Sequence, residues 1–177
     1  MALLEELKVR PSDPQLRKFF LIGIILLIIT YPLMGYFIFM AQVPQDPYIQ
    51  GQLSFSGMYL KDFYFQIGNL DAYRTAQILD YLFMVSYGLF FFALTLRLAR
   101  KFDSSQTINK IGRIMAVCAI AAALFDVCEN LFILLTLANP FNFADWMAVT
   151  HSVFALIKWL LLSSVLIWDL IFMVEKP

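Results

Sequence analysis

The sequence contains few of the residues that build catalytic or metal sites in soluble proteins. Its 177 residues include two cysteines and one histidine, and only 15% of them are charged. The cysteines, Cys118 and Cys128, lie ten residues apart, a spacing that fits neither CxxC redox chemistry nor a zinc site. A Gly-rich nucleotide loop, a GxSxG elbow and an HExxH motif are also missing. With no basic block and a formal net charge of zero, the chain has no feature of a nucleic-acid-binding protein.

Apolar residues dominate what is present. The chain is 61% hydrophobic and 16% aromatic, with a mean hydropathy of +0.74, whereas soluble domains are about 45–50% apolar and about 25% charged. Four apolar runs, residues 19–43, 72–98, 111–138 and 145–174, are each long enough to cross a hydrocarbon core of about 30 Å as a helix. The sequence therefore predicts an all-α, polytopic integral membrane protein, in which residues 1–177 form a single four-helix transmembrane domain, an up-down bundle.

The connection between the first and second spans is long and aromatic. Residues 44–69 carry prolines, glutamines and glycines, and residues 56–65 fit a short helix. We interpret this segment as a long outer loop, and both an ordered connection and a lid over a site remain open.

Basic residues give the orientation of the four spans. Ten Lys and Arg residues fall on the side of the two termini and the second-to-third linker, against two on the other side. Because cytoplasmic loops carry the excess of Lys and Arg, both termini are expected to be cytoplasmic. Few cysteines and no N-x-S/T acceptor site favour a bacterial or archaeal plasma membrane.

Ionisable residues inside the apolar runs are the strongest functional signal, because such groups face the protein interior or a wet cavity. Counted from the span midpoints at about 1.5 Å of rise per residue, Asp126 and Lys158 fall near the bilayer centre. By the same count Glu129 lies roughly 4–5 Å outward, Asp80 about 7–9 Å and His151 about 12 Å. These groups gather in the outer half, and we expect almost no polar groups in the inner half before the basic helix ends.

Helical spacing directs these side chains towards a common interior. Residues three, four or seven apart share one face of a helix. The sets that share a face in this way are Asp126 with Glu129 and Asn130, His151 with Lys158, and Asp80 with Tyr87. Polar stripes on three helices can share hydrogen bonds when they face one another.

A purely structural interpretation covers part of this cluster. Asp126 and Lys158, at equal depth, are expected to form a buried ion pair that fixes helix register, and Glu129 has no equally obvious partner. Three carboxylates, with Asp80 as the third, face one lysine, so the cluster carries a formal −2 when His151 is neutral. Protonation, a bound cation or water must relieve that charge.

The cluster predicts a polar, net-acidic cavity in the outer half that binds a small or lipid-like ligand. Glu129 and His151 are the candidate acid and base of such a site. The remaining candidate ligand-binding residues are Asp80, Asp126, Asn130, Lys158, Tyr31 and Tyr87. The residues leave open whether the ligand is also converted, and therefore whether the protein is an enzyme, and they name no cofactor.

Two alternatives stay open beside this hypothesis. One is a non-catalytic accessory or assembly subunit of a membrane complex, whose polar cluster only holds the helices together. The other is metal binding by Asp80, Glu129 and His151, since carboxylates and imidazole suit iron, manganese or zinc, although no HxxxH or ExxH spacing is present. The expected partners are membrane lipid, together with a small hydrophobic ligand or a partner membrane protein.

Overall fold

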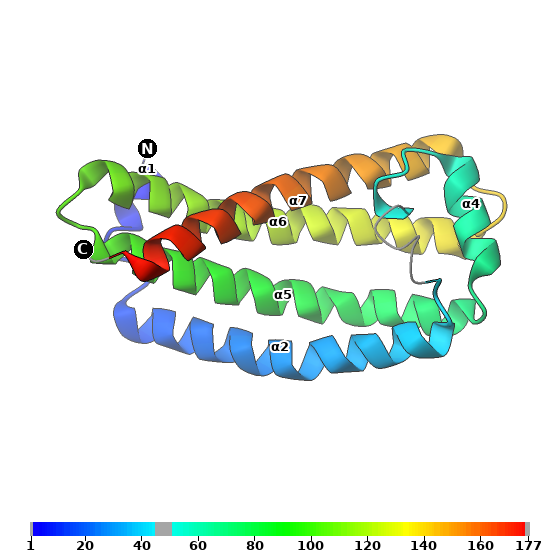
Figure 1. The fold of residues 1–177 in the computed structure, drawn as a ribbon, viewed down its shortest axis with the longest axis horizontal. Helices are drawn as coiled ribbons and strands as arrows, with labels where there is room; N and C mark the ends of the chain where they lie inside the picture. The colour runs from blue at the N-terminus through cyan, green and yellow to red at the C-terminus, as the bar shows by residue number, and fades with distance from the viewer. Residues whose placement is uncertain (1, 45–50, 176–177) are drawn as a thin grey trace.

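The computed structural model describes residues 2–44 and 51–175, and every regular element within these ranges is a helix (Figure 1). The helices are α1 (Ala2–Glu6), α2 (Asp13–Ala41), α4 (Gly57–Gln66), α5 (Leu70–Lys101), α6 (Gln106–Ala138) and α7 (Asp145–Val174). Four of them, α2, α5, α6 and α7, have the length and the apolar composition needed to cross a membrane. The expectation of an all-α chain with four long apolar helices is confirmed.

Local capping explains where α5 and α2 begin. The side chain of Asn69 accepts hydrogen bonds from the backbone N–H groups of Asp71 and Ala72, so α5 begins where a polar residue can satisfy its free donors. Helix α2 begins ahead of the predicted residue 19, because Ser12 and Gln15 form a capping box. Helix α7 has the predicted limits, 145–174.

The long helices follow one another across the molecule in chain order. Consecutive long helices run in opposite directions (Figure 1), with α2 packed almost entirely on α5, α5 on α6, and α6 on α7. We call the end that carries Arg97, Arg100 and Lys101 of α5 the basic end. The opposite end, across which α4 lies, is called the α4 end.

Helix α7 crosses the others diagonally (Figure 1). At the basic end it meets α5, where the Thr95 hydroxyl donates a hydrogen bond of 2.9 Å to Asp169. At the α4 end it is held by α4 instead, through a 3.1 Å ion pair between Lys61 Nζ and Asp145 Oδ1. Figure 1 shows α7 diverging from α5 towards the α4 end. The packing of α5 against α7 is therefore concentrated at the basic end.

Glycines set the closest helix contacts. A Cβ atom on Gly23 of α2 would lie 2.8 Å from the backbone nitrogen of Phe90 on α5. A Cβ atom on Gly88 of α5 would lie 3.1 Å from the Cβ atom of Ala123 on α6. Small residues at these positions let the helix backbones approach closely.

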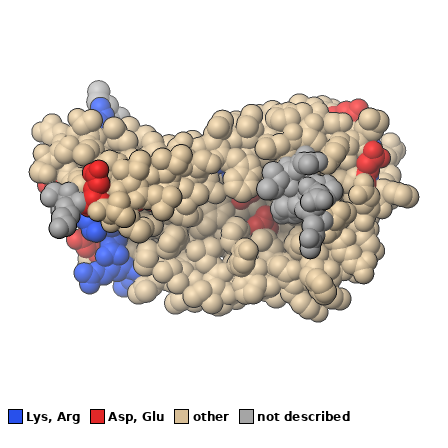
Figure 2. Space-filling view, viewed as in Figure 1, with Lys and Arg blue, Asp and Glu red and all other residues tan. Residues whose placement is uncertain are grey.

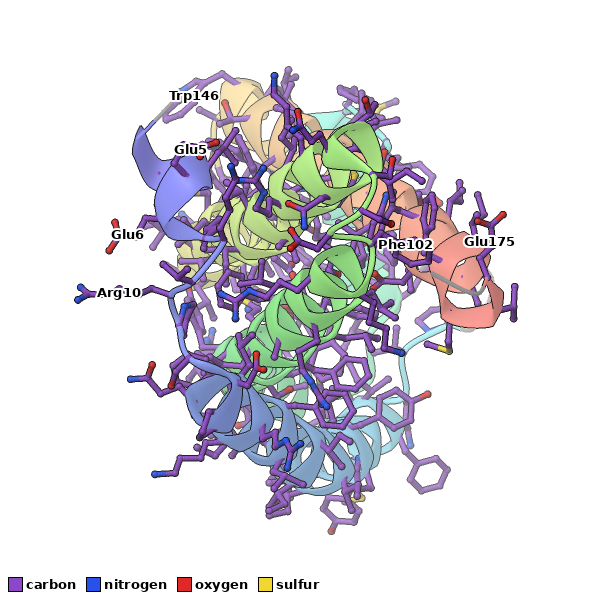
Figure 3. All side chains as sticks on the ribbon, turned by 90° about the vertical axis from the view of Figure 1, so that its left-hand side faces the viewer. Glu5, Glu6, Arg10, Phe102, Trp146 and Glu175 are labelled. Carbon is purple, nitrogen blue, oxygen red and sulfur yellow. The ribbon has the colours of Figure 1, made fainter. Side chains whose placement is uncertain are left out.

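The N-terminal segment folds onto the basic end. Arg100 donates hydrogen bonds to the carbonyl oxygens of Leu7 at 2.9 Å and Pro11 at 2.8 Å, and Arg113 donates to the carbonyl oxygen of Leu4. Leu7 is itself buried. Helix α1 is thus a packed part of the basic end, and Figure 3 shows it beside the long helices, where Glu5 marks it.

The predicted short helix of the connecting segment is confirmed as α4. The Ser56 side chain caps it by accepting a hydrogen bond from the backbone N–H of Tyr59. Its Tyr64 is buried against α6, with 2.7 Å between its hydroxyl and that of Thr136, and burial raises the pKa of this phenol. Residues 45–50 of the predicted outer loop lie outside the described residues.

Candidate functional site

The candidate site is built on α6, the helix that lies between α5 and α7. Its Asp126, Glu129 and Asn130 are buried, with side chains directed towards the two neighbouring helices, as their i, i+3, i+4 spacing predicts. Glu129 and Asn130 are each only 1% exposed. A polar or ionisable group at that depth needs a partner, and each of these three side chains contacts α5 or α7.

Lys158 of α7 joins the two carboxylates of α6. Its Nζ atom lies 3.0 Å from Asp126 Oδ1 and also forms an ion pair with Glu129 Oε2. The expected pairing of Asp126 with Lys158 is confirmed. The expectation that Glu129 lacks such a partner is wrong, because carboxylates one helical turn apart both fall within reach of one long, flexible lysine side chain.

His151 completes the contact with α7. Its Nε2 atom lies 3.5 Å from Glu129 Oε1, and the imidazole is 1% exposed. Neither ring nitrogen, Nδ1 or Nε2, has a hydrogen-bond partner among the described residues. Glu129 therefore lies between a lysine and a histidine, and both polar atoms of the buried imidazole remain without a hydrogen bond.

Helix α5 supplies the other wall. The Tyr87 hydroxyl donates a hydrogen bond of 2.8 Å to Asp126 Oδ2, so both oxygens of that carboxylate are engaged. The Asn130 amide donates to the backbone carbonyl oxygen of Gln77 at 2.6 Å and, more weakly, to Asp80 Oδ2 at 3.4 Å. Three helices thus meet in one network of charged and polar side chains.

Asp80 lies at the edge of this network. It is half-buried, and no cationic side chain in the described part of the chain forms an ion pair with it. Figure 2 shows acidic atoms at the floor of a hollow in the face between α7 and α5. The chain next to α4 runs along this side of α7, where Gln52 accepts a hydrogen bond from the Trp159 indole N–H and Ser152 accepts one from the Phe55 backbone.

The structure does not bring Tyr31 to the cluster. This residue of α2 is 67% exposed, and its ring packs at 6.3 Å from the ring of Phe83 on α5. The other seven residues singled out from the sequence lie together on α5, α6 and α7. Tyr31 differs because α2 packs on α5 and has no comparable contact with another long helix, so its position along the helix does not bring it near α6.

The charges of the cluster do not balance. Asp80, Asp126 and Glu129 face Lys158, so a formal −2 remains when His151 is neutral. Such a site favours a proton or a cationic, hydrogen-bond-donating group. No group of three or more His, Cys, Asp or Glu side chains in residues 2–44 and 51–175 is arranged to hold a metal ion.

One buried polar contact was missed by the sequence reasoning. Asp169 of α7 is 3% exposed and accepts a hydrogen bond from Thr95 of α5, which contradicts the expectation that the inner half holds almost no polar groups. A signal was available, because Asp169 follows Lys158 by eleven residues, about three helical turns, and so shares its face.

Fold and site together define a class: an all-helical chain with four helices long and apolar enough to span a membrane, and a buried ionic cluster shared by three of them. Comparison with known proteins adds no relative to this description, since no protein-family model, curated protein or solved structure matches the chain.

Proposed function

We propose that α2, α5, α6 and α7 span a membrane as an up-down bundle with both chain termini on the cytoplasmic side. The lengths and apolar compositions of the helices support this insertion. The bias of Lys and Arg towards the basic end supports the orientation, because such residues mark cytoplasmic ends. In this orientation the α4 end is outside, and the ionic cluster lies in the outer half of the membrane. A bacterial or archaeal plasma membrane remains the proposed location.

Within that bundle, we propose that the cluster binds a small or lipid-like ligand that presents a cationic or hydrogen-bond-donating group. The observation that supports this most directly is Asp80, a half-buried carboxylate beside a fully buried ion network with no cation of its own. A protein that needed only to hold its helices together has no use for this extra acid, because an unpaired charge near hydrocarbon is costly. The hollow between α7 and α5 would admit the ligand from the side or from outside (Figure 2).

Chemical conversion of the ligand would use Glu129 and His151. The two side chains are neighbours, with 3.5 Å between Nε2 and Oε1, and transfer of a proton between them requires this separation to shorten to about 2.6–3.2 Å. Lys158 would tune Glu129, and Asp80 would orient the ligand. Conversion is an addition to the binding proposal, and evidence against conversion would leave the binding proposal intact.

Mass spectrometry of the purified full chain tests the binding proposal. Small molecules and lipids that remain with the protein would be identified for the wild type and for Asp80→Asn, with Asp103→Asn, an exposed carboxylate at the basic end, as the matched control. We expect Asp80→Asn to lose a bound cationic or donor-bearing molecule that Asp103→Asn retains. Equal retention by both variants would refute the assignment of Asp80. If Glu129→Gln retained the bound molecule but no longer converted it, Glu129 would be needed for conversion and not for binding.

An accessory or assembly subunit is the second candidate. It is favoured by α2, which buries only Leu16, Gly23, Thr30 and Ala41 and leaves an apolar surface along its length. A partner membrane protein would cover this surface. Gentle extraction of the full chain from its own membrane, followed by measurement of the mass of the complex, distinguishes the two: a stoichiometric second protein, with no ligand loss in Asp80→Asn, would establish the accessory role.

A further inference from the structure

A groove at the basic end lies far from the ionic cluster and has a different composition. It is formed between the start of α2 and the end of α5 and has a volume of about 370 Å³. Its basic side chains are Arg17, Arg97, Arg100 and Lys101, and its apolar lining is Phe20, Leu94 and Leu98. Figure 2 shows Lys and Arg side chains gathered at this end of the molecule. Cations beside an apolar surface are the composition expected for a lipid rather than for a soluble anion.

The positive charge of this groove is only partly neutralised by ion pairs within the described residues. The one acid of the groove, Asp13, lies 3.3 Å from Arg100, whose guanidinium also binds two backbone carbonyl oxygens. Arg17, Arg97 and Lys101 form no ion pair with any other described residue. Arg97 is half-buried, and its guanidinium lies 5.9 Å from the ring centroid of Phe20. A half-buried guanidinium with only a ring for a partner leaves its hydrogen-bond donors available to an anion.

The position of the groove matches the level of lipid headgroups. Arg97 lies one helical turn before the last residue of α5, and Arg17 one turn after the first residue of α2. Below Arg17, on the same face of α2, Leu21 and Ile28 are 57% and 68% exposed. An acyl chain could follow this apolar face while its headgroup remained at the basic residues.

We propose that this groove binds the headgroup of an anionic phospholipid, with the phosphate held by Arg17, Arg97 and Lys101 and one acyl chain lying along α2. The proposal rests on the membrane insertion proposed above and is independent of the ligand of the ionic cluster. Arg side chains hold phosphate oxygens through paired N–H groups, and Lys adds a point charge. The lipid is thus recognised by its charge at the interface and by its chain in the hydrocarbon.

Native mass spectrometry of the full chain in detergent tests this proposal. The probes are phosphatidylglycerol and phosphatidylcholine with identical acyl chains, each added alone or with excess inorganic phosphate. The triple variant R17Q/R97Q/K101Q removes the three groove cations that form no ion pair within the described residues, and it keeps Arg100, which is engaged with Asp13. The control R10Q/K18Q/K110Q removes three cations of the same end that do not line the groove, among them Arg10, which extends away from the bundle in Figure 3.

We expect the wild type to retain phosphatidylglycerol preferentially, with a loss of about fivefold in affinity per groove cation removed, equal to about 1 kcal/mol each. The control should stay within about twofold of the wild type, since none of its three side chains lines the groove. Three results would overturn the proposal: no preference for phosphatidylglycerol, an equal loss in the control, or displacement of the lipid by inorganic phosphate, which would indicate a free-anion site. Circular dichroism shows whether the triple variant keeps the helix content of the wild type. The single variant R17Q changes an exposed side chain, so a loss of lipid binding in it reflects the groove and not the fold. Resistance of the wild type to carbonate extraction tests insertion separately.

Discussion

The sharing of Lys158 between Asp126 and Glu129 predicts a specific pattern of stabilities. In Lys158→Met both buried carboxylates lose their cation, and breaking a buried ion pair from one side costs about 3–5 kcal/mol. Asp126→Asn or Glu129→Gln alone leaves Lys158 with the other carboxylate at contact distance. Each single change should therefore cost less, about 1–3 kcal/mol for a lost charge-assisted hydrogen bond.

The double variant D126N/E129Q carries the decisive measurement. It leaves the Lys158 ammonium, 5% exposed as a residue, with no carboxylate in contact. The cost should exceed the sum of the two single variants by about 0.5–3 kcal/mol, the range of coupling between residues that share a partner. Free energies of unfolding would be measured by titrating detergent-solubilised protein with a denaturing detergent and following helix content and tryptophan fluorescence.

Additive costs in D126N/E129Q would refute the shared pairing, because independent partners do not couple. So would a neutral Lys158→Met, since that result requires both carboxylates to be uncharged or otherwise paired. The triple variant D126N/E129Q/K158M provides the internal control. It removes every charge of the pairing together, and should recover much of the stability lost in D126N/E129Q, because replacing all partners by neutral groups avoids leaving a buried charge unpaired.

Two further predictions concern helix packing. Gly23→Ala should reduce the free energy of unfolding by about 1–3 kcal/mol through overpacking against Phe90. Gly35→Ala in the same helix has no atom within 4 Å of the added Cβ and should be neutral or slightly stabilising. Equal effects of the two changes in the same titration would contradict the close approach of α2 and α5. Thr95→Val should reduce the free energy of unfolding by about 1–3 kcal/mol, because the buried Asp169 carboxylate loses its hydrogen-bond donor. Thr95→Ser should retain most of the stability. A neutral Thr95→Val would show that the contact is not formed.

The sequence predicted the helices and most of the cluster because both depend on simple periodicities. Apolar length identifies a long helix, and 1.5 Å of rise per residue places Asp126 and Lys158 at one depth, where the structure has them 3.0 Å apart. The same periodicity carries no information on how far a side chain extends, so it did not predict that Lys158 also contacts Glu129. Depth alone also grouped Tyr31 with residues that lie on other helices, because it carries no information on which helices are neighbours.

The docking of the N-terminal segment could not be read from the sequence for a different reason. Arg100 and Arg113 hold it through the backbone carbonyl oxygens of Leu7, Pro11 and Leu4. Every residue carries such an acceptor, so no pattern of side chains marks the partner. Their basic character indicated only a helix end in a membrane, and the structure adds that these two side chains are engaged in packing α1.

The exposure of Asp80 follows from the crossing of α7. One polar face of α7 carries His151, Lys158 and Asp169, yet the first two contact α6, between the middle of α7 and the α4 end, while Asp169 contacts α5 at the basic end. A straight helix can meet two different neighbours with one face only by crossing them at an angle. The same angle carries α7 away from α5 at the level of Asp80, so that among the described residues the hydrogen-bond partner of this carboxylate is the amide of Asn130 at 3.4 Å. If the Thr95–Asp169 contact helps to fix the crossing, then Thr95→Val should alter ligand retention at Asp80 from the far end of the bundle, whereas Thr95→Ser should not.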